Sequence, residues 1–381
     1  MVGCTEKERN YHVFFFMMRG VDDARAKKLG LLKADGKRKD YPDFKYLSKC
    51  NDLSRDDDIA EYKFLIDSFN KLGFTDAEQD AIHRMTAASM HMGEIEFDNS
   101  TYDDGKDAKP VSVKNKAQIK IVAELLGLPS AEDLELELVH KGAMDGVSGR
   151  TPDKPQNVAN TKDSLAKAIF DNMFNWLVAK MNIEILPAEL KSSDFSAKEA
   201  FGQSTKTVGL LDIFGFENFE LNQFEQLCIN FVNEKLHNLY ISSVFGAEKK
   251  EMEREGIEVE LVLPALKVLD ILKLMDNPMQ KVAALGIFQL VDDKSGGNTL
   301  GAKTMNDRVK ELYNIILKNH EPNKDVFMKL RNSTKFTISH SAKDVIYDSK
   351  NFIERNADSM SESLAKLILQ KTDKTVGTIF S

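Results

Sequence analysis

Cysteines and long apolar runs are scarce in this sequence of 381 residues. Its three cysteines, Cys4, Cys50 and Cys228, form no Cys-x-x-Cys pair, and so low and odd a count favours a reducing, intracellular compartment. No apolar stretch approaches the ~18 residues that a membrane-spanning helix needs. The first residues place acids before their apolar run and have no small-residue cleavage site, so we predict no signal peptide. We expect a cytoplasmic protein without a membrane span.

An excess of positive charge is also missing. The 60 acidic residues outnumber the 52 basic ones and give a formal net charge of −8, which offers no support for nucleic-acid binding. Apolar residues make up 42% of the chain and charged residues 29%, which is the balance of an ordinary globular protein rather than a disordered one. The length predicts two or three domains, or one large multi-lobed unit, with enough chain to bury a large core.

Several motifs of catalytic and metal sites are absent. The seven histidines are scattered, with no H-E-x-x-H and no Cys/His cluster, so no zinc site is predicted. Ser148 lacks the G-x-S-x-G spacing of a hydrolase nucleophile. The chain contains no G-x-x-x-x-G-K-[ST] phosphate loop. The nearest stretch, GGNTLGAKT at 296–304, has Ala302 between its second glycine and the lysine and lies between two predicted helices, so we interpret it as a surface turn.

Helical patterns dominate what is present. Thr75, with Glu78 three residues later, forms a capping box, and Gly127 ends an amphipathic segment. Two segments that alternate at period two, KFTISH and DVIYD, predict a β-hairpin. Glycine and proline indicate a long exposed loop at 141–158, and charged residues indicate a connector at 247–260. The main predicted helices span 57–71, 76–92, 115–126, 161–182, 223–245, 263–275, 280–291, 306–317 and 351–369.

The stretch VGLLDIFGFENF, residues 208–219, combines an apolar run with two acids. Residues 208–213 are almost all apolar, as expected for a central parallel strand covered by helices on both faces. Such sheets bind ligands beyond the carboxyl ends of their strands, where Asp212, Gly215 and Glu217 would lie. There Asp212 could hold a water on Mg²⁺, the Gly215 N–H could approach a phosphate, and Glu217 could orient a water or pair with an arginine. The alternative is a strand followed by a turn glycine and solvated acids.

The longer stretch LLDIFGFENFELNQFEQLCINFVNEKLH closely resembles the switch II segment and relay helix of myosin motor heads. That family carries D-I-x-G-F-E and then F-E-Q-L-C-I-N-x-x-N-E-K-L, and both patterns are complete here, at 212–217 and 224–236. Other stretches resemble the family in the same order along nearly the whole chain, among them ERNYHVF, VAELLGLPSAEDL and KFTISHSAKDVIYDSKNFIERNAD. The resemblance implies a mixed α/β, predominantly helical fold, namely part of a myosin-type P-loop NTPase motor with an incomplete central sheet.

The resemblance also implies roles for individual residues. Asp212 would hold the water bound to magnesium, the Gly215 N–H would meet the γ-phosphate of ATP, and Glu217 would pair with a switch I arginine and help to position the attacking water. The helix that begins near residue 223 would relay this event to a lever, and we predict that Asn222 and Glu225 cap it. The implied relay residues are Asn222, Phe224, Glu225, Asn230, Asn233 and Glu234.

An actin filament and the remainder of the heavy chain are the partners that the resemblance implies, whereas light chains would bind outside this segment. The implied actin-binding residues are Lys141, Arg150, Leu285, Gly286, Ile287, Phe288, Asp292, Asp293 and Lys294. The alternative for the apolar residues of this set is a buried helix face. One departure from the family occurs at 340–343, where the usual H-Y-A-G is replaced by His-Ser-Ala-Lys.

The resemblance divides the chain into three segments: 1–206 as the upper half of the actin-binding cleft, 207–246 as the switch II strand and relay helix, and 247–381 as the lower half. ATP and magnesium are cofactors of the complete, cytoskeleton-associated motor. No phosphate loop and no switch I are found in this sequence, so we expect this chain alone neither to bind MgATP productively nor to hydrolyse it. The alternative function is a truncated, nucleotide-independent actin-binding or scaffolding protein. The motor interpretation requires Asp212 and Glu217 to lie in a crevice at the edge of a sheet, away from bulk solvent.

Overall fold

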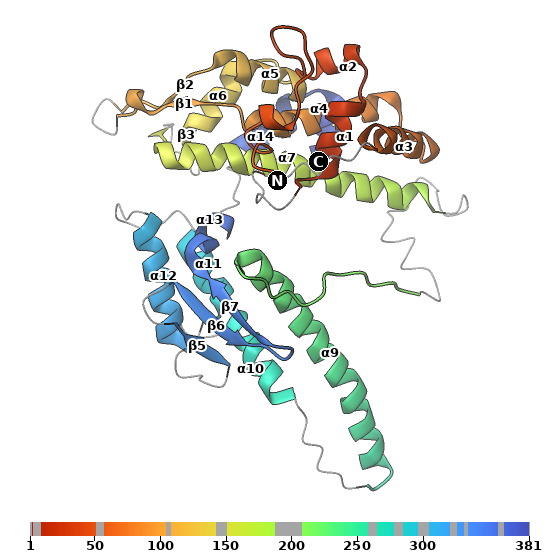
Figure 1. The fold of residues 1–381 in the computed structure, drawn as a ribbon, viewed down its shortest axis with the longest axis vertical. Helices are drawn as coiled ribbons and strands as arrows, with labels where there is room; N and C mark the ends of the chain where they lie inside the picture. Colours follow the sequence, from red (N-terminus) through yellow and green to blue (C-terminus); the bar gives the residue numbers. More distant parts are fainter. Residues whose placement is uncertain are drawn as a thin grey trace. The chain divides into compact units, whose positions relative to one another are not determined.

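The computed structural model describes residue 2 and residues 9–50, 57–103, 108–141, 151–186, 208–257, 265–277, 285–295, 305–320, 326–330, 334–356 and 362–380. The chain forms two compact units (Figure 1): an N-terminal unit of Met1–Thr207 with Ser359–Ser381, and a central unit of Val208–Asp358. These units differ from the three predicted segments, because 208–246 and 247–358 share one unit and the last residues belong with the first unit. Helices predominate and the sheets are small, so the predicted mixed, mainly helical class is confirmed.

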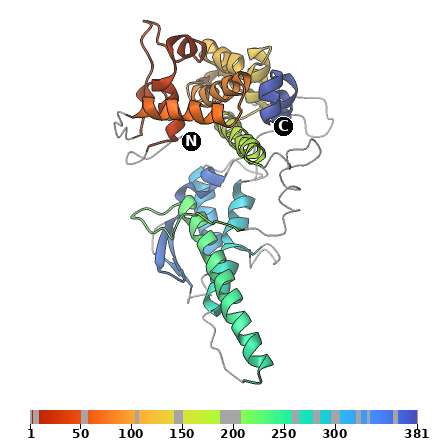
Figure 2. The same cartoon turned by 90° about the vertical axis from the view of Figure 1, so that its right-hand side faces the viewer.

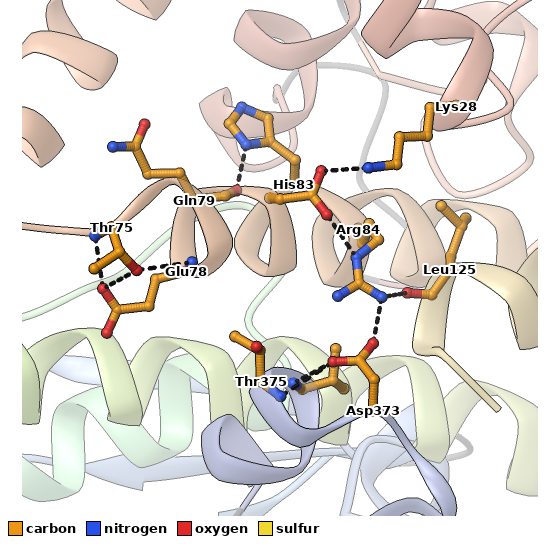
Figure 3. A network of polar contacts seen from close by, with 11 residues as sticks. Lys28, Thr75, Glu78, Gln79, His83, Arg84, Leu125, Asp373 and Thr375 are labelled. Atoms are coloured by element: carbon orange, nitrogen blue, oxygen red, sulfur yellow. Dashed lines mark hydrogen bonds and ion pairs between the residues drawn. The ribbon is translucent and has the colours of Figure 1, made fainter.

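The N-terminal unit is built around α4 (Asp76–Met92), most of whose side chains are buried. Its predicted capping box is confirmed: Thr75 Oγ1 accepts from the Glu78 N–H at 3.3 Å, and the Thr75 N–H donates to Glu78 Oε2 at 2.7 Å (Figure 3). The helices that pack against α4 include α1 (His12–Gly20), α5 (Lys116–Leu126), α7 (Pro155–Glu184) and α15 (Lys374–Phe380). The unit also contains α2 (Asp23–Lys28), α3 (Asp58–Lys71), α6 (Ala131–Val139), α14 (Glu362–Lys371) and the strand pairs β1 (Phe97–Asp98) with β2 (Ser112–Val113) and β3 (His140–Lys141) with β4 (Thr151–Pro152).

Polar contacts attach the C-terminal helix α15 to this unit (Figure 3). Arg84 donates to Asp373 Oδ2 at 2.6 Å and to the Leu125 carbonyl at 3.2 Å, and Asp373 Oδ1 accepts from the Thr375 N–H at 3.1 Å. Gly127 gives Asp373 the space to approach, because a Cβ at this residue, which has φ of 69°, would lie 2.2 Å from Asp373 Oδ2. A late segment of the chain is therefore fixed to α4 and to the end of α5.

One helix boundary and one cysteine of the N-terminal unit differ from the sequence prediction. Helix α7 begins at Pro155, ahead of the predicted residue 161, because proline suits the first turn of a helix, where its missing N–H costs no hydrogen bond.

Cys50 is disulfide-bonded, which the low cysteine count did not predict, whereas Cys228 in the central unit is a free thiol. Among the described residues, no helix is both long enough and apolar enough to cross a lipid bilayer.

The central unit packs helices against a three-stranded antiparallel sheet in the order β5 (Phe327–Lys329), β6 (Lys335–Ser339) and β7 (Asp344–Asp348). The predicted hairpin is confirmed, with Phe336 opposite Tyr347 and both side chains buried. The helices are α9 (Phe224–Arg254), α10 (Ala265–Met275), α11 (Ile287–Ser295), α12 (Met305–His320) and α13 (Phe352–Asn356). The predicted helix at 351–369 is thus wrong in its extent, because α13 ends at Asn356 and α14 begins at Glu362.

Helix α9 is longer than predicted and extends past the sheet of its unit (Figures 1 and 2). Residues 247–254 continue the helix instead of forming a connector, because Glu, Lys, Met and Arg are good helix formers. An ion pair four residues apart, Lys249 with Glu253 at 3.8 Å, supports this turn, and Gly256 with φ of 73° follows its end.

The predicted central strand at 208–213 is wrong. This segment has no regular secondary structure, and no described strand of the chain pairs with it. Val208 and Leu210 are 94% and 97% exposed, although a strand buried on both faces was expected. A central parallel strand needs neighbouring strands and covering helices, and the described strands of the central unit instead form their own antiparallel sheet.

A buried histidine in α4 makes the N-terminal unit sensitive to acid. His91 Nε2 lies 3.0 Å from the Leu29 carbonyl, and its Nδ1 lies 2.9 Å from Gln118 Nε2, so we assign the proton to Nε2. Burial and then the positive charge of Lys39 lower the pKa of His91 to about 4, although the bond to Leu29 acts in the opposite direction. His91 is therefore neutral in the folded protein at physiological pH.

We predict that the N-terminal unit loses stability as the pH falls from about 6.5 to about 4. The unfolded chain protonates His91 near its ordinary pKa of 6.5, whereas the folded chain resists protonation down to about 4, so protons favour unfolding in this window. At about 1.4 kcal/mol per pH unit, the loss due to His91 is at most about 3 kcal/mol. Urea unfolding can be followed by the fluorescence of Trp176, the single tryptophan, which packs against Phe74 in this unit.

A His91→Gln variant is the control for this prediction. It should be less stable than the wild type at pH 7.5, yet its stability should fall less steeply between pH 6.5 and 4.5. His83, whose pKa burial also lowers, is present in both proteins and contributes equally to both curves. Equal slopes for wild type and variant would show that His91 does not govern this pH dependence.

Candidate functional site

Asp212, Gly215 and Glu217 lie on the irregular segment that leads into α9. Asp212 is exposed, and nothing lies within 4 Å of the position that a Cβ on Gly215 would take. Neither residue therefore lies in the crevice expected from the sequence, and only Glu217 is half-buried, so the requirement that both acids lie away from bulk solvent is not met by this chain's own structure. The described residues contain no group of three or more His, Cys, Asp or Glu side chains that could hold a metal ion.

The fully buried side-chain amide of Asn230, in the second turn of α9, holds the turn at Glu217. Its Oδ1 accepts from the Glu217 N–H at 2.8 Å, and its Nδ2 donates to the Glu217 carbonyl, also at 2.8 Å. The Glu217 carboxylate is held separately, because Oε2 accepts from Gln226 Nε2 at 3.2 Å. Both the main chain and the side chain of Glu217 are thereby fixed relative to α9.

Asn230 also connects the turn to the hairpin. Its Nδ2 donates to the hydroxyl oxygen of Tyr347, in β7, at 2.8 Å, and this hydroxyl lies 2.8 Å from His340 Nε2. The Tyr347 hydroxyl has one donor and two acceptor positions, so it can accept from Asn230 and also share a hydrogen bond with His340 Nε2. His340 Nδ1 lies 3.1 Å from Glu234 Oε1. His340 thus joins the Tyr347 hydroxyl to the Glu234 carboxylate.

Glu234 on α9 binds the bend between β6 and β7. Besides His340, it accepts from the Ser341 N–H at 2.8 Å and from the Ser341 hydroxyl at 2.7 Å. Burial alone would raise the pKa of Glu234, but the hydrogen bonds from His340 and Ser341 outweigh burial and hold that pKa below its ordinary value. Ser341 stands where the resembled family usually has tyrosine, and its short hydroxyl makes a direct bond to the carboxylate.

Asn222 stabilises the turn rather than the helix. Its Oδ1 accepts from the Phe219 N–H at 2.8 Å, and its Nδ2 donates to the Phe219 carbonyl at 3.0 Å and to the Ile346 carbonyl at 3.1 Å. The predicted cap by Asn222 and Glu225 is therefore wrong. The capping box of α9 is formed by Gln223 and Gln226, one residue further along, because the Asn222 side chain is already engaged by the turn.

The remaining relay residues join α9 to its neighbours in the central unit. Phe224 packs against Phe288 of α11 and Phe352 of α13, with ring centroids 6.0 Å and 5.4 Å apart. Glu225 pairs with Arg355 at 3.3 Å. The Asn233 amide donates to the Ile229 carbonyl at 2.9 Å and to the Phe214 carbonyl at 3.3 Å. All six predicted relay residues thus contact the turn, the hairpin or the helices of the central unit.

The residues predicted to touch actin fall into different environments. Gly286 and Ile287 are buried, and Phe288 packs against Phe224 and Phe231, so the buried-face alternative holds for these three residues. Leu285 is half-buried, and Asp292 and Asp293 are exposed. Lys141 lies in β3, whereas Arg150 and the side chain of Lys294 fall outside the part of the chain that the structure describes.

Sequence reasoning missed His340 and Tyr347 as members of this site. The alternation of DVIYD places Val345 and Tyr347 inward and Ile346 outward, as the burial of these residues confirms. An inward tyrosine needs a partner for its hydroxyl, so the pattern held a signal for a buried polar contact. His340 lies only seven residues before Tyr347, in the same hairpin, whereas Asn230 lies 117 residues away and could not be inferred as a partner.

We predict that Asn230→Ala loosens the turn at Glu217. The substitution leaves the Glu217 N–H and carbonyl without their buried partner, and each hydrogen bond left unmade costs roughly 1–3 kcal/mol. Hydrogen exchange measured by mass spectrometry should speed up in peptides that cover 214–219 and 340–348. Asn233→Ala is the matched control, because its amide bonds mostly to its own helix and its contact to Phe214 is long. Equal exchange in the two variants would contradict the role assigned to Asn230.

The whole chain matches a family model. Residues 1–381 match the model described as myosin head (motor domain). Curated relatives include a myosin-I heavy chain of Dictyostelium discoideum, 31% identical over 99% of this chain and 15% of the relative, and a myosin IE heavy chain of the same organism, 29% identical over 100% and 36%. A myosin-2 of Saccharomyces uvarum is 32% identical over 97% of this chain and 22% of the relative.

The chain therefore spans between about a seventh and about a third of the length of these relatives. The match nevertheless extends over all of its residues, and both unbroken sequence patterns, at 212–217 and 224–236, lie within it. The chain belongs to the myosin head (motor domain) family.

Proposed function

We propose that this chain is a segment of an actin-based, ATP-driven motor, and that it carries the switch II turn, the relay helix and part of the actin-facing surface. The single observation that supports this most is the match to the myosin head over residues 1–381. In this proposal 212–217 is switch II, and α9 is the relay helix.

The contacts of Asn230 support a mechanical link between turn and helix. The Asn230 amide, which belongs to α9, bonds to both the N–H and the carbonyl of Glu217. A nucleotide-dependent shift of Glu217 would therefore also move or strain α9. The same amide bonds to Tyr347, so the hairpin experiences the shift as well. We infer that turn, helix and hairpin respond together to events at the nucleotide.

The residues present do not fit an MgATP site by themselves. The sequence has no phosphate loop, Asp212 is exposed, and the space around Gly215 is open rather than shaped as a cradle. Acids alone repel a polyanion instead of positioning it, and no ion pair of Asp212 or Glu217 with a lysine or arginine occurs within the described part of the chain. We therefore propose that the remainder of the heavy chain holds the nucleotide and that this chain alone does not catalyse ATP hydrolysis.

The exposed Asp212 and the open space around Gly215 also favour an alternative function, namely nucleotide-independent binding or scaffolding on actin. In both functions the proposed filament contact includes the exposed Asp292 and Asp293 of α11 and, by sequence, Lys141, Arg150 and Lys294. Light chains would bind outside this segment in the motor.

We predict that the chain alone shows no saturable, magnesium-dependent binding of a fluorescent ATP analogue. The physical reason is the missing positive cradle for the phosphates. Fluorescence anisotropy with and without EDTA measures this directly, and a heavy chain that contains a phosphate loop is the positive control. Saturable binding that EDTA abolishes would refute our account of the cofactor.

Co-sedimentation with actin filaments tests the proposed partner. We expect the chain to pellet with filaments, and Lys294→Glu to weaken binding several-fold because it reverses a charge within the proposed contact. Lys249→Glu, the same change on the exposed far part of α9, should bind like the wild type. Failure of the wild type to pellet would argue against both the motor segment and the nucleotide-independent binder.

A further inference from the structure

A small cavity lies in the central unit where three segments meet. Its volume is about 220 Å³, below the roughly 300–1,000 Å³ of sites for drug-sized ligands, so it suits a molecule of about the size of one substituted ring. The walls come from the turn before α9, from α9 itself and from the bend between β6 and β7. The lining residues are Phe216, Asn233, Glu234, His237, Ser341 and Ala342.

Hydrogen bonds and ring packing fix the walls of this cavity. The Phe216 ring packs edge-on against His340, with centroids 5.3 Å apart and planes at 75°. Asn233 is held through its Nδ2 by two main-chain carbonyls, and Glu234 is held by the Ser341 N–H and hydroxyl. A site whose walls are already ordered costs little conformational entropy when a ligand enters.

The groups that line the cavity favour a positive ligand. Glu234 is ionised at neutral pH, because the hydrogen bonds it accepts outweigh the effect of its burial and lower its pKa. The Asn233 nitrogen is engaged with main-chain carbonyls, which leaves the amide oxygen of Asn233 as its acceptor for a ligand. None of the six lining residues is a lysine or an arginine. Phe216 adds an aromatic ring, which attracts cations over its face.

We propose that this cavity binds a small planar organic cation of the amidinium or guanidinium class, with its flat group at Phe216 and an N–H group at the amide oxygen of Asn233. The Glu234 carboxylate, which is only 2% exposed and already accepts from His340 and Ser341, attracts the cation by its charge rather than by a direct hydrogen bond. The site goes beyond the proposed motor function, because it requires neither nucleotide nor actin. A ligand here touches the turn, α9 and the hairpin bend at once, so its binding also restrains these three segments relative to one another.

The residue at position 341 keeps this cavity open. The resembled family usually has tyrosine at this position, whereas Ser341 contributes only a hydroxymethyl group. A tyrosine here adds a ring that has to be placed beside Phe216 and Ala342, in the space that the ligand would use. Ser341→Tyr therefore places a large aromatic side chain at this wall of the cavity.

Calorimetric titration of the full chain with benzamidinium tests the proposal. The probe combines one ring with a planar cation, and benzamide is its neutral counterpart of nearly the same shape. We expect saturable binding of benzamidinium and at least tenfold weaker binding of benzamide, because only the cation gains from Glu234 and Phe216. Equal binding of the two probes, or no saturable binding of benzamidinium, would overturn the proposal.

Two substitutions place the binding in this cavity. Phe216→Leu removes the ring and should weaken benzamidinium binding about fivefold or more, whereas Phe219→Leu, in the same turn but with an exposed side chain that does not line the cavity, should change it less than twofold. Ser341→Tyr should abolish binding while circular dichroism shows an intact fold. Equal effects of the two phenylalanine substitutions, or wild-type binding by a folded Ser341→Tyr protein, would show that the cation binds elsewhere.

Discussion

The side-chain amide of Asn230 is the contact on which the central unit's site depends. The Glu217 peptide belongs to no helix or strand, so its N–H and carbonyl have no ladder to satisfy them, and buried main-chain groups need partners. A single amide supplies both partners, because its oxygen accepts and its nitrogen donates two hydrogen bonds. A carboxylate in its place could not donate, and an aliphatic side chain could do neither. The second donor position of Asn230 reaches Tyr347 and thereby joins the turn to the sheet.

From Tyr347 the hydrogen bonds continue to His340 and then to Glu234. Since a carboxylate only accepts hydrogen bonds, His340 Nδ1 is the donor to Glu234. Burial would raise the pKa of Glu234, but the hydrogen bonds from His340 and Ser341, together with the electrostatic attraction of His340, hold it below its ordinary value. Buried networks of this kind are rigid when every member is satisfied and costly when one is missing.

The parts of the fold that local rules encode could be predicted from the sequence. Thr75 and Glu78 form their capping box, Gly127 ends α5 in a left-handed conformation, and the hairpin around His340 follows from period-two alternation. Helix α9 was predicted too short, because its charged last turns were taken as a connector although their residues favour helix. The contacts of Asn230 could not be inferred, since one asparagine in an amphipathic helix does not reveal which distant groups it faces.

The predicted strand at 208–213 is wrong because a strand depends on partners outside its own segment. The same distinction between local and distant partners applies to Asp212 and Glu217. A strand covered on both faces depends on partners that other segments must supply, whereas the turn at Glu217 depends only on α9 and β7, both present in the central unit. Asp212 lies five residues before Glu217 and is exposed, and none of the hydrogen bonds described for Asn222, Gln226 or Asn230 reaches it. Glu217 is therefore positioned by its own unit, while the position of Asp212 relative to Glu217 is left to whatever sheet the apolar residues 208–213 join. If the two acids act on one ligand, as we propose, Glu217 is fixed by contacts within its own unit and Asp212 is not, so the complete sequence motif does not by itself form a complete site in this structure.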